Sequence, residues 1–139
     1  MRDLSELGIE QASAVNDHVI EAVQQQLGVR LPKEYLAFVR YNDEAQPAIS
    51  AIEFGGEKTV INSFFKFTDD KQESYGVLAY FGIPGLPEAI VPFARDPGDA
   101  FFCMDFNKSG RIVFYNPETN QIVHVADSFG DFIDNLYEP

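Results

Sequence analysis

The sequence predicts an α+β fold, with an antiparallel sheet of about six strands flanked by N-terminal helices and a C-terminal helix. Three observations support this prediction. Apolar residues recur with a helical period near both ends of the chain, and short segments rich in β-branched and aromatic residues lie between them. The connections between those segments are too short for the crossovers that parallel strands require. We therefore expect a strand meander with helices over one face.

Two helices are predicted in the first third of the chain. The apolar positions of the first, residues 13–27, are Val15, Val19, Ala22, Val23 and Leu27. Gly28 follows as its C-cap, and Leu31-Pro32 opens the second helix, because a proline at an early helical position loses no hydrogen bond. The side chains that the second helix should bury are Leu31, Tyr35, Phe38 and Val39.

The first strands are predicted to form a hairpin. Residues 48–54 and 59–67 are predicted to be its two strands, on either side of a Gly55-Gly56 turn. Beyond them, residues 75–82 are predicted to form a short helix, although Gly76 lowers its stability by about 1 kcal/mol.

Four further strands are predicted in the second half of the chain. They are residues 89–94, 99–106, 111–116 and 121–126, separated by turn signals. Pro92 indicates that the first of them lies at an edge or starts late, because proline cannot donate to a β-ladder.

A closing helix is predicted after Ser128, a suitable N-cap. Its apolar face consists of Phe129, Phe132, Ile133, Leu136 and Tyr137. On such a helix four carboxylates fall within about 60° of one another: Asp127, Asp131, Asp134 and Glu138. This predicted acidic stripe is either a partner-binding surface or the solvated side of an amphipathic helix.

The chain is strongly acidic. Its 22 Asp and Glu against 10 Lys and Arg give a formal net charge of −12. This charge argues against binding to nucleic acid or to membranes, because both polyanions attract proteins largely through Lys and Arg. A basic partner protein is the natural complement, although an acidic surface also serves solubility. Further acidic candidates for partner binding lie in predicted loops: Asp43, Glu44, Asp69 and Asp70.

The sequence does not support catalysis, a cofactor or a metal site. Cys103 lies in an apolar run and is predicted to be a buried, inert thiol. The two histidines, His18 and His124, form no HExxH or HxH motif, and there is no CxxC motif. Residues 105–110 imitate the start of an EF-hand loop, but Asn116 stands where a bidentate Glu belongs, so we expect a β-turn.

Length and composition predict one domain spanning residues 1–139. That length, with 45% hydrophobic residues, suits a single core. The start does not resemble a signal peptide, no apolar run is long enough for a bilayer, and one cysteine cannot form an internal disulfide. These observations predict a cytoplasmic protein.

Two blocks of the sequence resemble the SUKH superfamily of Smi/Knr-like proteins. The first, residues 27–42, has a Leu-Gly pair, a Leu-Pro pair and an aromatic-rich helix that ends in Asn. The second, residues 86–115, has Leu-Pro, then Pro-Phe-Ala-Arg-Asp, Gly-Asp, an apolar segment around Cys103 that ends in Asp, and a glycine before the next strand. Asp43-Glu44 stands where the family often has a Gly pair, which makes that turn more acidic.

The resemblance implies a non-catalytic domain that in bacteria commonly serves as the immunity protein of polymorphic or contact-dependent toxins, many of them nucleases. It supplies no toxin-contact residues, so the acidic positions are candidates on physical grounds. An acidic inhibitor could occupy or block the basic phosphate-binding site of a nuclease. Two alternatives remain: a regulatory scaffold domain, as in the fungal branch of the superfamily, and an acidic DNA mimic.

Overall fold

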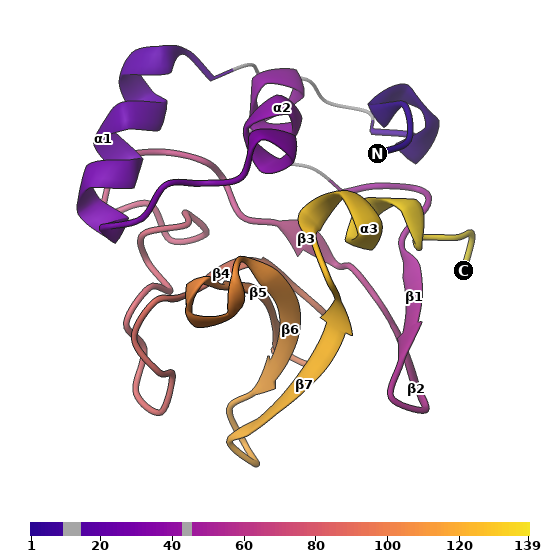
Figure 1. Cartoon of the computed structure of the whole chain (residues 1–139). Coiled ribbons are helices and arrows are strands. Elements are labelled where there is room, and N and C mark those ends of the chain that lie inside the picture. The colour runs from indigo at the N-terminus through magenta and orange to yellow at the C-terminus, as the bar shows by residue number, and fades with distance from the viewer. Residues whose placement is uncertain (10–14, 43–45) are drawn as a thin grey trace.

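The computed structural model describes residues 1–9, 15–42 and 46–139. Its helical elements are η1 (Leu4–Leu7), α1 (Asp17–Leu27), α2 (Lys33–Tyr41), η2 (Phe106–Lys108) and α3 (Phe129–Asp134). Its strands are β1 (Ala51–Phe54), β2 (Glu57–Val60), β3 (Ser63–Phe64), β4 (Ile90–Arg95), β5 (Phe101–Asp105), β6 (Arg111–Asn116) and β7 (Gln121–Ala126). Figure 1 shows the strands below α2 and α3. The predicted α+β fold is confirmed.

The strands form two antiparallel sheets. One has the order β3-β4-β5-β6-β7, and the other is the β1-β2 hairpin. The predicted strand 59–67 is split between them because the chain changes partner after β2. The Ile61 N–H donates to Ser50 O beside β1 at 2.9 Å, whereas the Asn62 N–H donates to Arg95 O of β4 at 2.8 Å.

Two local signals in the strands have clear structural causes. Gly55 and Gly56 have φ values of 54° and 81°, and this pair of positive φ angles forms the tight hairpin turn that the sequence predicts. Pro92 lies on β4, the second strand of its sheet rather than an edge strand. β3 pairs with β4 at Arg95 and Ala94, and the Phe65 N–H donates to Phe93 O at 2.9 Å. None of these contacts needs an N–H at Pro92, and a register shift on the β5 side follows Pro92.

One face of the five-stranded sheet carries an aromatic core beneath α2 and α3. Phe93 of β4 packs edge-on against Phe129 and Phe132 of α3, with ring centroids 5.5 and 5.3 Å apart. Tyr35 of α2 contacts Phe93 at 6.0 Å, and Phe102 of β5 contacts Phe132 at 5.3 Å. Rings thus fill the space between helices and sheet, and each such pair adds about 0.5–1.5 kcal/mol beyond its buried area.

The connection between β3 and β4 covers the opposite face. Phe101 and Phe102 are consecutive on β5 and so point to opposite faces. Phe65 stacks on Tyr80 with centroids 4.5 Å apart, and both rings contact Phe101. The sheet is therefore buried on both sides.

The short helix predicted for residues 75–82 is wrong. The Lys66 N–H donates to Tyr75 O at 2.8 Å, and the Val77 N–H donates to Lys66 O at 3.0 Å, so a parallel bridge uses backbone groups that a helix would need. A Cβ at Gly76 would lie 3.1 Å from the Thr68 methyl group, so this position fits glycine closely. Tertiary pairing decides the conformation here.

Two helix ends have the predicted caps, but the first helix starts later than predicted. Asn16, with an extended backbone, is the N-cap of α1, so Val15 precedes the helix instead of lying in it, and residue 13 lies outside the described residues. Gly28 ends α1 with φ 70°, and the Ser128 hydroxyl accepts the Asp131 N–H at 3.1 Å. The predicted buried residues of the second helix are confirmed. No helix in the described ranges is long and apolar enough to cross a membrane.

The closing helix is shorter than predicted. It ends at Asp134, and Tyr137 pairs with Ala51 of β1 through two backbone hydrogen bonds of 2.9 and 3.0 Å. The Arg2 guanidinium donates to the carbonyl oxygens of Ile133 at 3.2 Å and Leu136 at 2.7 Å, which satisfies acceptors at the helix end. The chain thus leaves the helix to extend the hairpin.

Candidate protein-binding surface

Two exposed carboxylates lie on α3. Asp131 and Asp134 are three residues apart and so face similar directions. Asp131 is in the first turn, where the helix dipole favours negative charge, and within the described chain no cation pairs with it. Asp134 accepts the backbone N–H of Arg2 and lies 3.7 Å from the Met1 amino group. Asp134 therefore helps to hold the N-terminal segment.

The predicted stripe is not a continuous helical feature. Asp127 precedes the N-cap Ser128, and its Oδ1 lies 3.0 Å from Nε2 of His124. Glu138 lies beyond the helix and is exposed. Both residues flank α3. The prediction that all four carboxylates lie on one helix is therefore wrong, because only Asp131 and Asp134 do.

The hairpin adds a carboxylate that sequence analysis missed. Glu53 of β1 accepts a hydrogen bond from the Tyr137 hydroxyl at 3.0 Å, across 84 residues of sequence. Lys58 of β2 lies over the same ring, 5.5 Å from its centroid. Figure 1 shows the hairpin beside the C-terminus. No spacing pattern could have found this contact, because the β1–Tyr137 pairing creates it.

The acidic candidates in the predicted loops do not lie with the carboxylates at and beside α3. Asp70 accepts the Gln72 N–H at 2.9 Å and so shapes a turn, whereas Asp69 is exposed. Both belong to the connection between β3 and β4, which lies away from α3 in Figure 1. Asp43 and Glu44 lie outside the described residues.

A buried carboxylate holds the turn between β4 and β5. Asp96 is 8% exposed, and its Oδ1 accepts the N–H groups of Gly98 at 2.9 Å and Ala100 at 3.0 Å. Its Oδ2 accepts the hydroxyl of Thr59 on β2 at 3.0 Å. Asp96 therefore joins the hairpin to the five-stranded sheet.

A second buried carboxylate holds the next turn. Asp105 is 4% exposed, accepts the Asn107 N–H at 3.0 Å, and pairs with Arg111 at 3.3 Å. The 3-10 turn η2 follows it and leads directly into β6. Residues 105–110 thus form a tight turn between strands, as predicted, with Asp105 as its cap.

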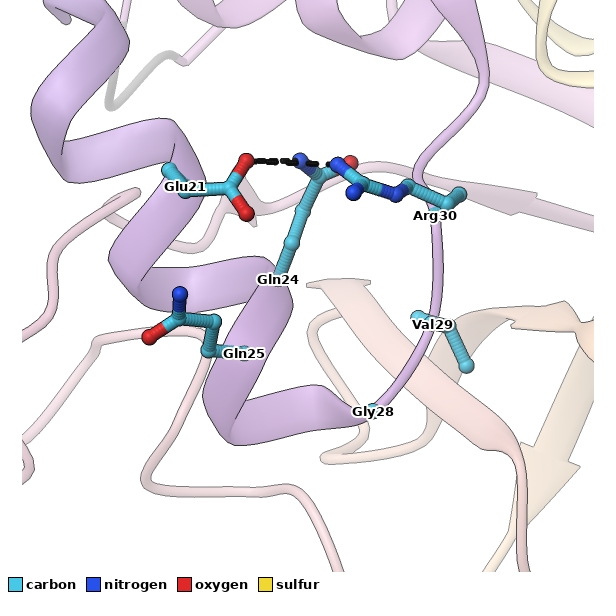
Figure 2. A pocket seen from close by; sticks show the side chains of 6 residues that line it. All are labelled: Glu21, Gln24, Gln25, Gly28, Val29 and Arg30. Carbon is cyan, nitrogen blue, oxygen red and sulfur yellow. Dashed lines mark hydrogen bonds and ion pairs between the residues drawn. The ribbon is translucent and has the colours of Figure 1, made fainter.

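Two hollows lie where α1 ends. Figure 2 shows the first, of about 230 Å³, in which Glu21 is paired with Arg30 at 3.2 Å and with Gln24 at 3.5 Å. The second, of about 520 Å³, lies between residues 27–29 and 81–89. The charged groups of the first hollow already satisfy one another, so we do not identify it as a ligand site.

The Cys103 thiol is placed for packing. It is fully buried on β5, and burial, with a smaller effect of the Asp105 charge, raises its pKa well above the usual value. Val113 of β6 lies between Cys103 and His124 in the sheet register, so the two side chains are two strand spacings apart, roughly 10 Å. Among the described residues, no group of three His, Cys, Asp or Glu could hold a metal ion.

Helices over an antiparallel sheet, with the aspartates of the second sequence block buried in its turns, form an α+β domain that is consistent with the SUKH fold. The model of the SMI1 / KNR4 family (SUKH-1) matches residues 14–135. The chain therefore belongs to the SMI1/KNR4 family. Its members are generally non-catalytic and generally bind partner proteins. No curated protein sequence matches the chain significantly.

Proposed function

We propose that the protein is an immunity protein that binds and neutralises a cognate bacterial polymorphic or contact-dependent toxin. The contact surface is the α3 acidic surface, which we define as Glu53, Asp127, Asp131, Asp134 and Glu138. The observation that carries the proposal is the exposed group of carboxylates at and beside α3, in a family whose members generally bind proteins. We propose that the encounter takes place in the cytoplasm.

Electrostatics supports a basic partner, such as a nuclease that must bind phosphates. With a net charge of −12, the protein attracts a basic protein from a distance. Steered association can reach roughly 10⁸–10⁹ M⁻¹s⁻¹ at low salt, and this speed suits an inhibitor of a lethal enzyme. Tyr41, 40% exposed at the end of α2, which packs against α3, is available as an aromatic anchor.

The test uses the toxin domain encoded beside this gene. Growth rescue on co-expression is measured together with affinity in about 0.15 M salt, near physiological ionic strength. The double variant Asp127→Lys/Asp131→Lys should weaken binding by at least about tenfold, because it reverses two exposed charges without touching the contacts of Asp134. Glu88→Lys, an exposed charge reversal on the connection between β3 and β4, is the matched control.

The outcomes separate the hypotheses. If growth rescue is unchanged in both variants, the interface does not include the α3 acidic surface, and Asp69-Asp70 or Asp43-Glu44 become the candidates. Salt-sensitive binding to many unrelated basic proteins would instead favour the DNA mimic. Absence of rescue and of binding would contradict immunity against that toxin and favour the regulatory scaffold.

A further inference from the structure

The edges of the two sheets differ in how they are protected from pairing with other chains. β3 has only two residues, and the bridge between Lys66 and Gly76 continues its pairing. β2 carries the exposed charges Glu57 and Lys58, and β1 is bridged to Tyr137. Short length, charge and cover are the usual means of blocking an edge strand.

β7 has none of these protections. Its six residues, Gln121–Ala126, include no proline, lysine, arginine or carboxylate. Within the described ranges, no backbone hydrogen bond joins β7 to any strand except β6. Ile122 is 36% exposed and lies opposite Tyr115, whereas Val123 faces the hairpin at Gly55. The hairpin therefore packs on a face of β7, and the outer row of backbone N–H and C=O groups is available for pairing.

The charges at the two ends of β7 indicate which strand would pair there. Glu118 precedes the strand and Asp127 follows it, and both side chains are exposed. A second copy of this chain would place these carboxylates beside one another and would bring together two molecules of charge −12. An extended segment with Lys or Arg near both ends would meet opposite charges in either direction.

We propose that the outer edge of β7 binds an extended, basic-ended segment of the partner protein, which adds a strand to the sheet. Main-chain hydrogen bonds supply affinity in this mode, and Ile122 supplies an apolar contact. Asp127 belongs both to this edge and to the α3 acidic surface, so one partner could contact both. This inference rests on the proposed function, since it takes the partner to be the basic toxin.

Two variants at one position test the inference. Ile122→Lys and Ile122→Asp place opposite charges on the edge, where each charge would have to be desolvated under an added strand. Binding of the neighbour-encoded toxin domain should weaken about tenfold or more in both variants. If only long-range charge mattered, Ile122→Asp would bind the basic toxin more tightly. Gln26→Lys, on an exposed position of α1, is the control and should change affinity less than about threefold.

Hydrogen exchange supplies the second measurement. The outward amides of β7 should gain protection in the complex with wild-type protein, and thermal unfolding should show that both Ile122 variants stay folded. A tight complex in which both Ile122 variants bind like wild type and β7 gains no protection would overturn the edge inference and leave the proposed function standing. A toxin that neither binds nor is neutralised would overturn the proposed function itself.

Discussion

The turn carboxylates and the surface carboxylates of this protein have opposite roles. Asp96 is buried and accepts three hydrogen bonds, whereas Asp131 is exposed and within the described chain has no cation paired with it. Asp96 lies in a sequence block that resembles the family, and Asp131 lies outside both blocks. The comparison teaches that the recognisable residues build the fold, while the residues suited to partner binding are found elsewhere.

The largest effect on stability is expected at Asp96, the buried carboxylate of this comparison. Asp96→Ala leaves two backbone N–H groups and the Thr59 hydroxyl without their acceptor. It should lower the free energy of unfolding by about 3 kcal/mol, measured by urea denaturation. Glu88→Ala is the control, because this side chain is exposed and lies away from the turn, and its effect should stay within about 0.5 kcal/mol. Equal effects of the two changes would contradict the assigned role of Asp96.

A smaller loss is expected at the next turn. Asp105→Ala removes the cap of η2 and the ion pair with Arg111, and should lower the free energy of unfolding by about 2 kcal/mol. Asp105→Asn keeps an oxygen for the Asn107 N–H and should recover part of that loss. If alanine and asparagine destabilise equally in chemical denaturation, the capping bond is not the source of stability.

Buried ionisable groups should also make the protein sensitive to alkali. Burial raises the pKa of Tyr35 above its usual value of 10.0, so the folded state keeps the phenol neutral. Its contribution to stability is fully present below pH 10 and is lost as pH rises, by about 1.4 kcal/mol at pH 11. Tyr35→Phe should remove this part of the pH dependence, measured as the difference in unfolding free energy between pH 9 and pH 11. An unchanged pH dependence would exclude Tyr35 as the cause, and Cys103→Ala then tests the thiol, whose pKa is raised in the same direction.

The smallest effect on stability is expected at Asp131, the exposed carboxylate of the comparison. Asp131→Lys loses a favourable dipole interaction and places a positive charge at the same helix end, and should cost about 1 kcal/mol in thermal unfolding. The same change should nevertheless weaken toxin binding, so stability and binding separate at this residue. A large loss of stability would show that Asp131 resembles Asp96 and would remove the contrast.

Local sequence signals predicted the local structure well. Gly28, the Gly55-Gly56 pair and Ser128 adopt the caps and turns expected of them, because each depends on its own backbone preference and near neighbours. The strands β6 and β7 match their predicted ranges, since strongly β-prone runs lie between clear turn signals.

The failures occurred where distant backbone groups compete with local preference. Residues 75–82 pack against the sheet without a helix because Gly76 and its neighbours pair with Lys66. The prediction that Glu138 lies on the closing helix is wrong because Tyr137, the residue before it, pairs with Ala51. Both pairings join segments too far apart for any periodic pattern to reveal.

The sequence by itself therefore determined the fold class, the caps, most of the strands and the acidic character of the surface, because these depend on composition and short-range periodicity. Only the tertiary structure decided which carboxylates are buried in turns, which are exposed beside α3, and that β7 is a long unprotected edge. These properties depend on which strands pair and which faces are covered, and pairing is a property of the whole chain.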